Sequence, residues 1–591
     1  MNDRKLNLII GWICFLISFI VYYLTAEPTV GFWDTGEYIT TSAKLQVGHP
    51  PGAPLYQMLG AIFSIFAFEK ENIGFIMNLM SGFASALAIS FMYWSIILIL
   101  KKITDTSEAS INKQILISGS ALVGSLAFAF TDTFWFSAVE TEVYAMATLI
   151  MAVIFYLGLR WEADMHNSRG DKWLLLICFV IGLSFGVHFM GLLVIPAIVM
   201  IYYFKNQKTI LNSTKVNPII GFFIANIIGL GILMGVFKLL LPNTLKFFSA
   251  IELLFVNNLG LPFNSGTLAA FVVIVYAFYF LINYTRRKGM VRANTITLCF
   301  LFIFIGFSSW LILPIRANAD VVVNENDPSN ARELLAYYNL EQYPKTYLFY
   351  GPLFSDQYSG LDKNKPYKDD NPKYEKDLIN NKYVIVNDYK NAVQNFNSDH
   401  ASILPRMWSS EHAKNYLNYS GYLDFKIKSK YISENELVEF VRNFKSKINN
   451  NEVDYEDFHN FLRQYGQFLD IEKPSILSNL YYLFDYQIGY MYWRYFMWNF
   501  AGRQNDIQGD YSITNGNWIS GIKFIDELRI GNQDAIDQDQ KNNKARNTYF
   551  FLPLILGIIG LMFCYKYDIQ SFWILLLLFL FTGLALKFYL N

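Results

Sequence analysis

Residues 6–25 read LNLIIGWICFLISFIVYYLT, a stretch without a single charged residue, and it sets the class of the protein. A helix rises about 1.5 Å per residue, so about twenty apolar residues cross the ~30 Å hydrocarbon core of a bilayer. Arg4 and Lys5 precede the stretch and predict a cytoplasmic N-terminus. A signal peptide has a similar pattern, but no clean small-x-small cleavage site follows. We therefore interpret 6–25 as a first membrane span.

Further apolar runs of sufficient length follow along the chain. They cover 73–100, 115–136, 142–160, 173–204, 218–241, 267–285, 294–315, 548–565 and 571–590. The run 173–204 has basic residues at both ends, which predicts two short helices that meet near Gly186–Phe189. Counting these as two gives about eleven spans, with 26–72, 317–546 and the C-terminus outside. Pro54–Phe68 is too short for a span and is predicted to be re-entrant or interfacial.

The composition supports this class. The 591 residues are 53% hydrophobic and only 16% charged, which is too apolar for a soluble globule. The 48 basic residues balance 48 acidic ones without a basic stripe, which argues against nucleic acid as a partner. The four cysteines all fall in apolar runs, so no disulfide framework is expected outside. We predict an α-helical polytopic membrane protein.

The domain prediction has three parts. Residues 1–316 form a transmembrane module with the first outer loop 26–72, residues 317–546 form a mixed, mainly helical outer domain, and 547–591 form two C-terminal spans. Within the outer domain, 476–500 carries eleven aromatic residues together with Asp485 and Arg494. This pattern predicts a helix lying on the membrane, since Tyr and Trp favour the headgroup level. A twelfth span is the alternative, which the two charges disfavour.

The first outer loop carries the residues with the clearest chemistry. It reads Gly31-Phe32-Trp33-Asp34-Thr35-Gly36-Glu37-Tyr38 and then His49-Pro50-Pro51-Gly52-Ala53-Pro54. Asp34 and Glu37 lie on one face if a helix opens at Asp34. Two roles stay open for Asp34: a helix N-cap, or a carboxylate tuned for proton transfer. His49 can exchange a proton or a hydrogen bond beside a backbone that two prolines hold rigid.

Together these motifs resemble a family of bacterial membrane proteins related to the animal transmembrane O-mannosyltransferase of plexin-type receptors. That family belongs to the GT-C glycosyltransferases, which use polyprenyl-phosphate sugars at the outer membrane face. The resemblance covers nearly the whole chain. It includes the segments 138–144, 186–188, 314–316, 324–328, 341–343, 405–408, 493–495 and 499–506. Relatives commonly continue beyond a segment like 571–590, so this sequence is either a piece of a longer chain or a short member.

The resemblance implies a mechanism and roles for single residues. Asp34 is expected to act as the base, with Glu37 beside it as a second catalytic residue. The reaction is an inverting transfer of a sugar to Ser or Thr hydroxyls of secreted or membrane proteins. Arg316 is the candidate phosphate ligand, although a residue at a helix end also snorkels to lipid headgroups. His49 and His188 are further donor-binding candidates, and a core histidine is the alternative for His188. Acceptor or sugar-binding candidates are Trp33, Glu140, Glu142 and Tyr144.

The expected donor is a polyprenyl-phosphate sugar, with mannose as the sugar. No cofactor is expected, and a divalent metal is not predicted, because Asp34, Glu37 and His49 serve proton transfer without one. The expected site faces the periplasm from a bacterial inner membrane. One alternative keeps the fold but uses a lipid or glycan acceptor. Another is a transporter, which the acids clustered in outer loops disfavour.

Overall fold

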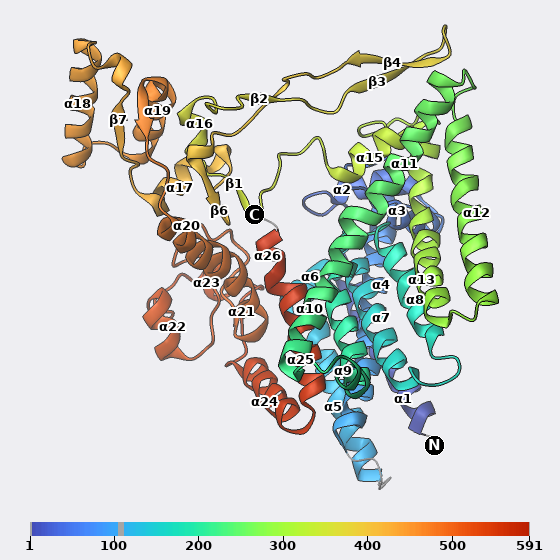
Figure 1. Ribbon diagram of the computed structural model, residues 1–591. Helices are drawn as coiled ribbons and strands as arrows, with labels where there is room; N and C mark the ends of the chain where they lie inside the picture. Colours follow the sequence, from blue (N-terminus) through green and yellow to red (C-terminus); the bar gives the residue numbers. More distant parts are fainter. Residues whose placement is uncertain (1–2, 105–110, 590–591) are drawn as a thin grey trace. The chain divides into compact units, whose positions relative to one another are not determined.

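The structure is a computed structural model that describes residues 3–104 and 111–589 (Figure 1). The chain divides into two compact units. Unit 1 comprises Met1–Tyr343 and Met497–Gly583, and unit 2 comprises Pro344–Phe496 and Leu584–Asn591. Residues 317–343 and 497–546, which the sequence assigns to the outer domain, therefore pack with the membrane-type helices of unit 1.

Unit 1 is built mainly from helices. The first are α1 (Asp3–Thr25), α2 (Thr35–Ala43), α3 (Pro54–Ser64), α4 (Ile73–Ile103), α5 (Ile111–Ala129), α6 (Asp132–Ala138), α7 (Val143–Asp164), α8 (Asp171–Ser184), η2 (Phe189–Val194) and α9 (Ile195–Thr214). Next come α10 (Pro218–Met234), η3 (Gly235–Leu240), α11 (Leu241–Leu253), η4 (Leu254–Asn258), α12 (Ser265–Arg287), α13 (Val291–Phe307), α14 (Ile312–Ala317) and α15 (Ala331–Asn339). The C-terminal part adds β9 (Gly502–Arg503), α22 (Lys523–Ile530), α23 (Gln538–Lys541), β10 (Asn547–Thr548), α24 (Leu552–Tyr567) and α25 (Ile569–Phe579).

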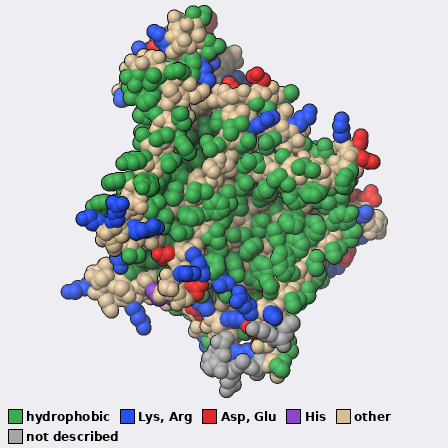
Figure 2. All heavy atoms as spheres, turned by 90° about the vertical axis from the view of Figure 1, so that its right-hand side faces the viewer, with side chains coloured by type: hydrophobic (Ala, Val, Ile, Leu, Met, Phe, Trp, Pro, Cys, Tyr) green, Lys and Arg blue, Asp and Glu red, His purple; other side chains and the backbone are tan. Residues whose placement is uncertain are grey.

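The helices confirm a polytopic membrane protein. Within residues 3–104 and 111–589, eight segments are long and apolar enough to cross a membrane: Asp3–Thr25, Lys70–Ile103, Val143–Asp164, Phe189–Thr214, Pro218–Asn258, Ser265–Arg287, Val291–Ala317 and Ile569–Phe588. The pair α5 and α6, bent by 70°, makes a ninth if counted as one span. Figure 2 shows a broad hydrophobic field on the side where α12 lies, with Lys and Arg side chains around its edges, as expected of a surface in contact with lipid.

The predicted count of about eleven spans is too high, because two expected spans form short helices. α8 has 14 residues and α24 has 16, so each is shorter than the hydrocarbon core is thick. The predicted break in 173–204 is confirmed, since α8 ends at Ser184 and η2 starts at Phe189. Leu590, the last residue of the predicted span 571–590, lies outside the described residues.

The predicted span 218–241 extends much further than expected. Proline usually ends a helix because it lacks an N–H donor. Here the π-helix η3 precedes Pro242, and the helical segment continues to Asn258. A π-turn absorbs one extra residue per turn and often marks a functional position.

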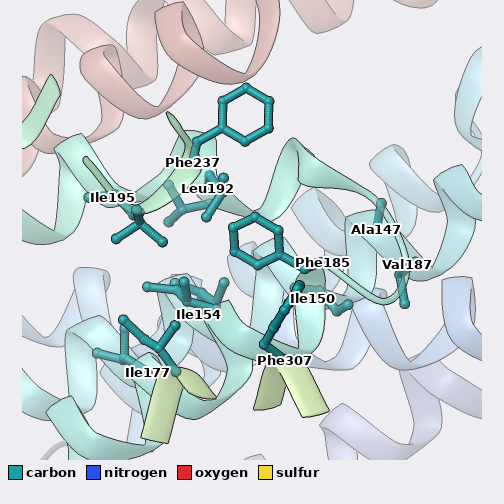
Figure 3. Close-up of a cluster of buried hydrophobic side chains, with 14 of the residues drawn as sticks. Ala147, Ile150, Ile154, Ile177, Phe185, Val187, Leu192, Ile195, Phe237 and Phe307 are labelled. Carbon is teal, nitrogen blue, oxygen red and sulfur yellow. The ribbon is translucent and has the colours of Figure 1, made fainter. Parts of the chain in front are cut away.

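The core of unit 1 gathers side chains from helices distant in sequence. Ile150 and Ile154 of α7, Ile177 of α8 and Phe307 of α13 are all buried. Figure 3 shows them converging with Phe185, Leu192 and Phe237 in one apolar cluster. The cluster lies next to the turn between α8 and η2, so it fixes the position of that turn.

Unit 2 combines short helices and two-stranded sheets. Its elements are β1 (Tyr350–Pro352), α16 (Asp356–Ser359), β2 (Tyr367–Lys368), β3 (Lys373–Asp377), β4 (Lys382–Asn387), β5 (Val393–Gln394), η6 (Ser398–His400), β6 (Ala401–Ile403), α17 (Ala413–Ser420), β7 (Phe425–Ile427), α18 (Asn435–Asn449), α19 (Tyr455–Tyr465), β8 (Leu469–Ile471), α20 (Ile476–Tyr482), η10 (Leu483–Trp493) and α26 (Ala585–Tyr589). β1 pairs with β6, β2 with β5, β3 with β4 and β7 with β8, all antiparallel. The core forms around Phe354, Leu417, Phe458 and Leu462.

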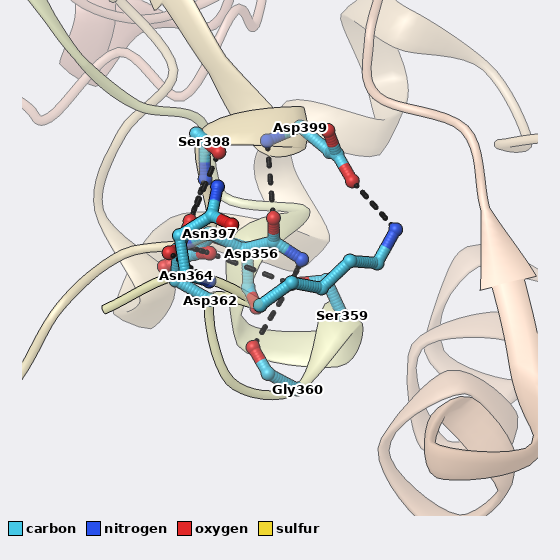
Figure 4. A network of polar contacts seen from close by, with 9 residues as sticks. Asp356, Ser359, Gly360, Asp362, Asn364, Asn397, Ser398 and Asp399 are labelled. Atoms are coloured by element: carbon cyan, nitrogen blue, oxygen red, sulfur yellow. Dashed lines mark hydrogen bonds and ion pairs between the residues drawn. The ribbon is translucent and has the colours of Figure 1, made fainter. Parts of the chain in front are cut away.

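A polar network fastens two loops of unit 2 (Figure 4). Asp362 accepts hydrogen bonds from the backbone N–H groups of Asn364, Lys365 and Ser398. These donors hold the pKa of Asp362 well below its usual range. The network therefore has a structural role.

The predicted aromatic segment 476–500 is helical throughout. It forms α20, η10 and α21 (Arg494–Phe500), and it is not among the eight candidate spans of the described chain. That it lies on the membrane stays a prediction.

Candidate active site

Three side chains of the first outer loop form a row at the start of α2. Asp34 precedes the helix and makes no side-chain capping hydrogen bond, which leaves its carboxylate available for other contacts. Nε2 of His49 lies 3.8 Å from Oδ2 of Asp34, and Nδ1 of His49 lies 2.9 Å from Oε2 of Glu37. The backbone N–H of His49 donates to Oε1 of Glu37 at 2.6 Å. The imidazole thus lies between two carboxylates.

The row couples the charges of its members. The hydrogen bond between His49 and Glu37 lowers the pKa of Glu37 and raises the pKa of His49, and in both groups this contact outweighs burial. Glu37 is therefore held ionised, and it orients the ring of His49. Asp34 is the most exposed member, with 58% of its side chain accessible. It is the more exposed of the two carboxylates in the row.

The segment after His49 is positioned by a contact distant in sequence. The hydroxyl of Tyr337, from α15, donates to the carbonyl of Gly48 at 2.5 Å. At Gly52, where φ is +69°, a Cβ atom would lie 2.6 Å from the same hydroxyl. Only glycine fits there, since it tolerates both the positive φ and the close approach. Tyr337 therefore sets the path of the chain from His49 into α3.

The turn between α8 and η2 joins the site through α3. The backbone N–H groups of Leu55 and Tyr56 donate to the carbonyl of Gly186 at 2.7 and 3.1 Å. His188 follows two residues later, and its Nδ1 accepts a hydrogen bond from the backbone N–H of Met190 at 3.2 Å. Its proton is then on Nε2. The ring lies 5.6 Å from that of Tyr144, which is 48% exposed at the start of α7.

The loop between α6 and α7 carries a second pair of acids. Glu140 and Glu142 are only 7% and 5% exposed. Burial raises the pKa of both to about 7, with a further contribution from Glu142 at Glu140 and from Asp34 at Glu142. The backbone N–H groups of Val143 and Asp34 partly offset this at Glu142. Near neutral pH these two acids can hold or release a proton.

Asn78 of α4 ties the two acidic loops together. Its Nδ2 donates to the carbonyls of Glu27 and Thr29 at 2.6 and 2.9 Å, and its Oδ1 accepts from Oγ1 of Thr141 at 2.5 Å. The amide is fully buried. At Gly31 a Cβ atom would lie 3.1 Å from Oε2 of Glu140, so the loops approach closely where Asn78 holds them.

Arg316 lies at the C-terminal end of α14. Its Nε donates to the carbonyl of Leu45 at 2.6 Å, just after α2. The backbone N–H of Val47 donates to the carbonyl of Val323, and the backbone N–H of Glu325 donates to the carbonyl of Val47. Val47 and Asn324 therefore form a parallel β-bridge. Within the described residues Arg316 forms no ion pair, so its terminal nitrogens are free for an anion. Trp33 precedes Asp34 and is 87% exposed, with φ of 58°.

The structure thus links all the predicted site residues to one set of connected loops, although their roles stay predictions. Sequence reasoning missed Asn78 and Tyr337. A polar Asn inside the apolar run 73–100 is a signal for Asn78, since a buried amide needs partners. Nothing local to Tyr337 indicates that it reaches Gly48. The described residues contain no group of three His, Cys, Asp or Glu arranged to hold a metal ion.

Two known protein families match parts of this chain, and one of the matches covers most of the site. Residues 34–211 match the family described as the N-terminal domain of the protein O-mannosyl-transferase TMEM260, and 344–484 match a family of unknown function, DUF8416. The chain is related to the TMEM260 protein O-mannosyl-transferases. The first match begins at Asp34 itself and includes every predicted site residue except Trp33 and Arg316. The second match coincides with most of unit 2.

Two curated relatives give the same result. The protein O-mannosyl-transferase tmem260 of Dictyostelium discoideum is 24% identical over 210 residues, which cover 34% of this chain and 24% of the relative. The TMEM260 protein of Mus musculus is 27% identical over 167 residues, covering 28% of this chain and 21% of the relative. The matching segments thus span less than a quarter of each relative. No solved structure matches the chain significantly.

Proposed function

We propose that this protein is an inverting GT-C glycosyltransferase that moves mannose from a polyprenyl-phosphate carrier to Ser or Thr hydroxyls of proteins. The proposal places the site at the periplasmic face of a bacterial inner membrane. The observation that carries it is the match over residues 34–211, which contains the row Asp34, His49 and Glu37 together with Glu140, Glu142, Tyr144 and His188. Chemistry and family relation therefore point to the same residues.

The row supports a general base at Asp34. In the transfer, the acceptor oxygen forms a bond to the anomeric carbon while the bond from that carbon to the phosphate oxygen breaks. The hydroxyl proton passes to Asp34, and the electron pair of the broken bond leaves with the polyprenyl phosphate. Glu37 holds His49, and His49 holds a proton close to Asp34. The imidazole of His49 therefore lies 3.8 Å from the carboxylate that would receive the acceptor proton.

Other residues would bind the substrates. Polyprenyl phosphate is a weakly basic leaving group, so it needs charge stabilisation more than protonation. The free terminal nitrogens of Arg316 suit phosphate oxygens, since a guanidinium group donates in a planar fork. His49 and His188 would assist in donor binding. Glu140, Glu142, Trp33 and Tyr144 would contact the sugar or the acceptor.

The test is transfer of radiolabelled mannose from synthetic polyprenyl-phosphate mannose to a Ser/Thr peptide library by the purified protein. Asp34→Asn should lower the rate by about 10²–10⁴-fold, the usual contribution of a general base. Glu71→Gln is the matched control, an exposed acid in the same outer loop. Its rate should equal that of the wild type.

Other outcomes would change the proposal. Wild-type donor binding without transfer to peptides would redirect it to a lipid or glycan acceptor. Absence of donor binding would refute the glycosyltransferase proposal and favour a transporter. Equal rates for Asp34→Asn and the wild type would remove Asp34 from the mechanism.

A further inference from the structure

Unit 2 has exposed apolar side chains on three separate segments. Phe349 and Ile403 are 74% and 71% exposed, and Ile476 and Leu477 at the start of α20 are 64% and 78% exposed. We call these four residues the apolar collar. Large apolar side chains gathered on a surface usually mark a contact with lipid or protein.

Hydrogen bonds join the segments of the collar. Ile403 lies opposite Tyr350 in the β1–β6 ladder, and the backbone N–H of Leu404 donates to the carbonyl of Phe349 at 2.8 Å. Nδ2 of Asn479, one turn after Ile476, donates to the carbonyl of Leu404 at 2.7 Å. The segments that carry the four collar residues therefore lie next to one another.

Arg406 connects this surface to the end of the last candidate span. Arg406 is 1% exposed, and its backbone N–H donates to Oδ1 of Asn479 at 2.8 Å. Its Nη2 donates to the carbonyl of Leu348 at 3.3 Å, and its Nη1 donates to the carbonyl of Phe588 at 3.1 Å. Phe588 is the last residue of the span Ile569–Phe588. The backbone beside the collar is thus joined through Arg406 to the end of this candidate span.

The other end of this span identifies the direction in which it crosses. Asp568, just before Ile569, lies 3.8 Å from Nζ of Lys102 at the end of α4. The same Nζ contacts Glu162 at 2.7 Å. Lys101 and Lys102 are the basic residues that predict the cytoplasmic end of α4. Phe588 therefore emerges on the face opposite to that of the basic loops.

We propose that the apolar collar of unit 2 lies in the headgroup and upper acyl region of the outer leaflet. Its occupant is the membrane lipid itself, because a candidate transmembrane segment ends at Arg406, whose side chain also binds the backbone next to Phe349. Apolar side chains on an interfacial element insert about 5–10 Å into this region. Arg406 serves as the anchor, since its side chain binds both the end of the span and the backbone beside the collar. This inference does not depend on the proposed enzymatic function.

The test measures lipid contact at single positions in the full chain. Ile403→Cys and Leu477→Cys are labelled with an environment-sensitive fluorophore and reconstituted in nanodiscs whose lipids carry bromine high on the acyl chains. The unlabelled wild type corrects for its own cysteines, of which Cys14, Cys178 and Cys564 are buried. The matched control is Ile432→Cys, which is 60% exposed and precedes α18. Within unit 2, α18 lies far from β6 and α20 (Figure 1).

The proposal expects quenching by brominated lipid at positions 403 and 477, protection there from aqueous iodide, and the reverse at position 432. Iodide quenching at 403 and 477 without lipid quenching would overturn it. Protection from both quenchers would also overturn it, because a protein would then cover the collar. A fluorescence spectrum of each labelled variant in detergent checks that the label itself does not unfold unit 2.

Discussion

Each of the two acidic loops of the candidate site carries two closely spaced acids, but the loops have opposite electrostatics. In the first loop, Glu37 accepts two hydrogen bonds from His49, and its pKa is lowered. In the second loop, burial raises the pKa of Glu140 and Glu142 to about 7. Both pairs consist of acids two or three residues apart, so spacing does not explain the difference. The partners and the exposure of each carboxylate decide its charge.

This difference suggests a division of labour. The first loop keeps Glu37 charged beside the imidazole of His49, which lies next to the proposed base, Asp34. The second loop carries Glu140 and Glu142, which are partly protonated near neutral pH. Asn78 holds the loops together, so the electrostatics of the second loop depend on that amide.

The largest effect is expected from breaking the tie between the loops. Asn78→Asp places an oxygen where Nδ2 now donates to the carbonyls of Glu27 and Thr29. A buried, unpaired carboxyl group of this kind should cost about 3 kcal/mol of unfolding free energy or more. Thermal unfolding in detergent measures it, and mannosyl transfer should fall in parallel.

Ser85→Ala is the control for Asn78→Asp. Ser85 is equally buried in α4, and its hydroxyl forms no hydrogen bond with a described residue. Its loss should change the unfolding free energy by less than about 0.5 kcal/mol. If both variants unfold at the same temperature, the amide of Asn78 does not tie the loops.

Much of the fold could be predicted from the sequence, because hydrophobic runs report directly on membrane spans. The break between α8 and η2 was also predictable, from basic residues at both ends of one apolar run. The spans 173–204 and 548–565 were harder to predict, since hydropathy does not show that α8 and α24 are too short to cross the hydrocarbon core. The continuation through Pro242 depends on a π-turn that no local pattern indicates.

Less of the site could be predicted, for a different physical reason. The row of Asp34, Glu37 and His49 lies within sixteen residues, so its members were visible as one motif. The burial of Glu140 and Glu142 results from packing against loops more than one hundred residues away. Tyr337 reaches Gly48 across 289 positions. Such contacts are fixed by the whole fold and leave no periodic signal.

The second prediction concerns the pH dependence of the buried acids. The folded pKa of Glu140 and Glu142 is about 7, above the ordinary value of 4.5. Between these values the folded chain binds more protons than the unfolded chain, so stability falls as pH rises from 4.5 to 7. The loss is on the order of 3 kcal/mol per group. Glu140→Gln with Glu142→Gln should flatten this part of a melting-temperature profile. A profile that keeps its slope would show that these acids are solvated.

The smallest effect, with the opposite sign, is expected from Glu37→Gln. The folded pKa of Glu37 lies below 4.5, so its contribution is present above pH 4.5 and is lost as pH falls through the folded value. The folded pKa of His49 lies above 6.5, so its contribution is present below pH 6.5 and is lost as pH rises through the folded value. The pair therefore stabilises most between pH 4.5 and 6.5, where the second loop becomes destabilising.

Glu37→Gln keeps an acceptor for His49 but removes the charge, so it should cost about 1 kcal/mol within that window and less outside it. The pKa of His49, followed by NMR of a histidine-labelled sample, should fall toward 6.5. Glu71→Gln should change neither quantity, because it removes an exposed charge elsewhere in the same loop. An unchanged pKa of His49 in Glu37→Gln would mean that Asp34 alone holds the imidazolium. The difference in carboxylate pKa between the two loops would then result from the exposure of their side chains alone, and the hydrogen bond between Glu37 and His49 would not contribute to it.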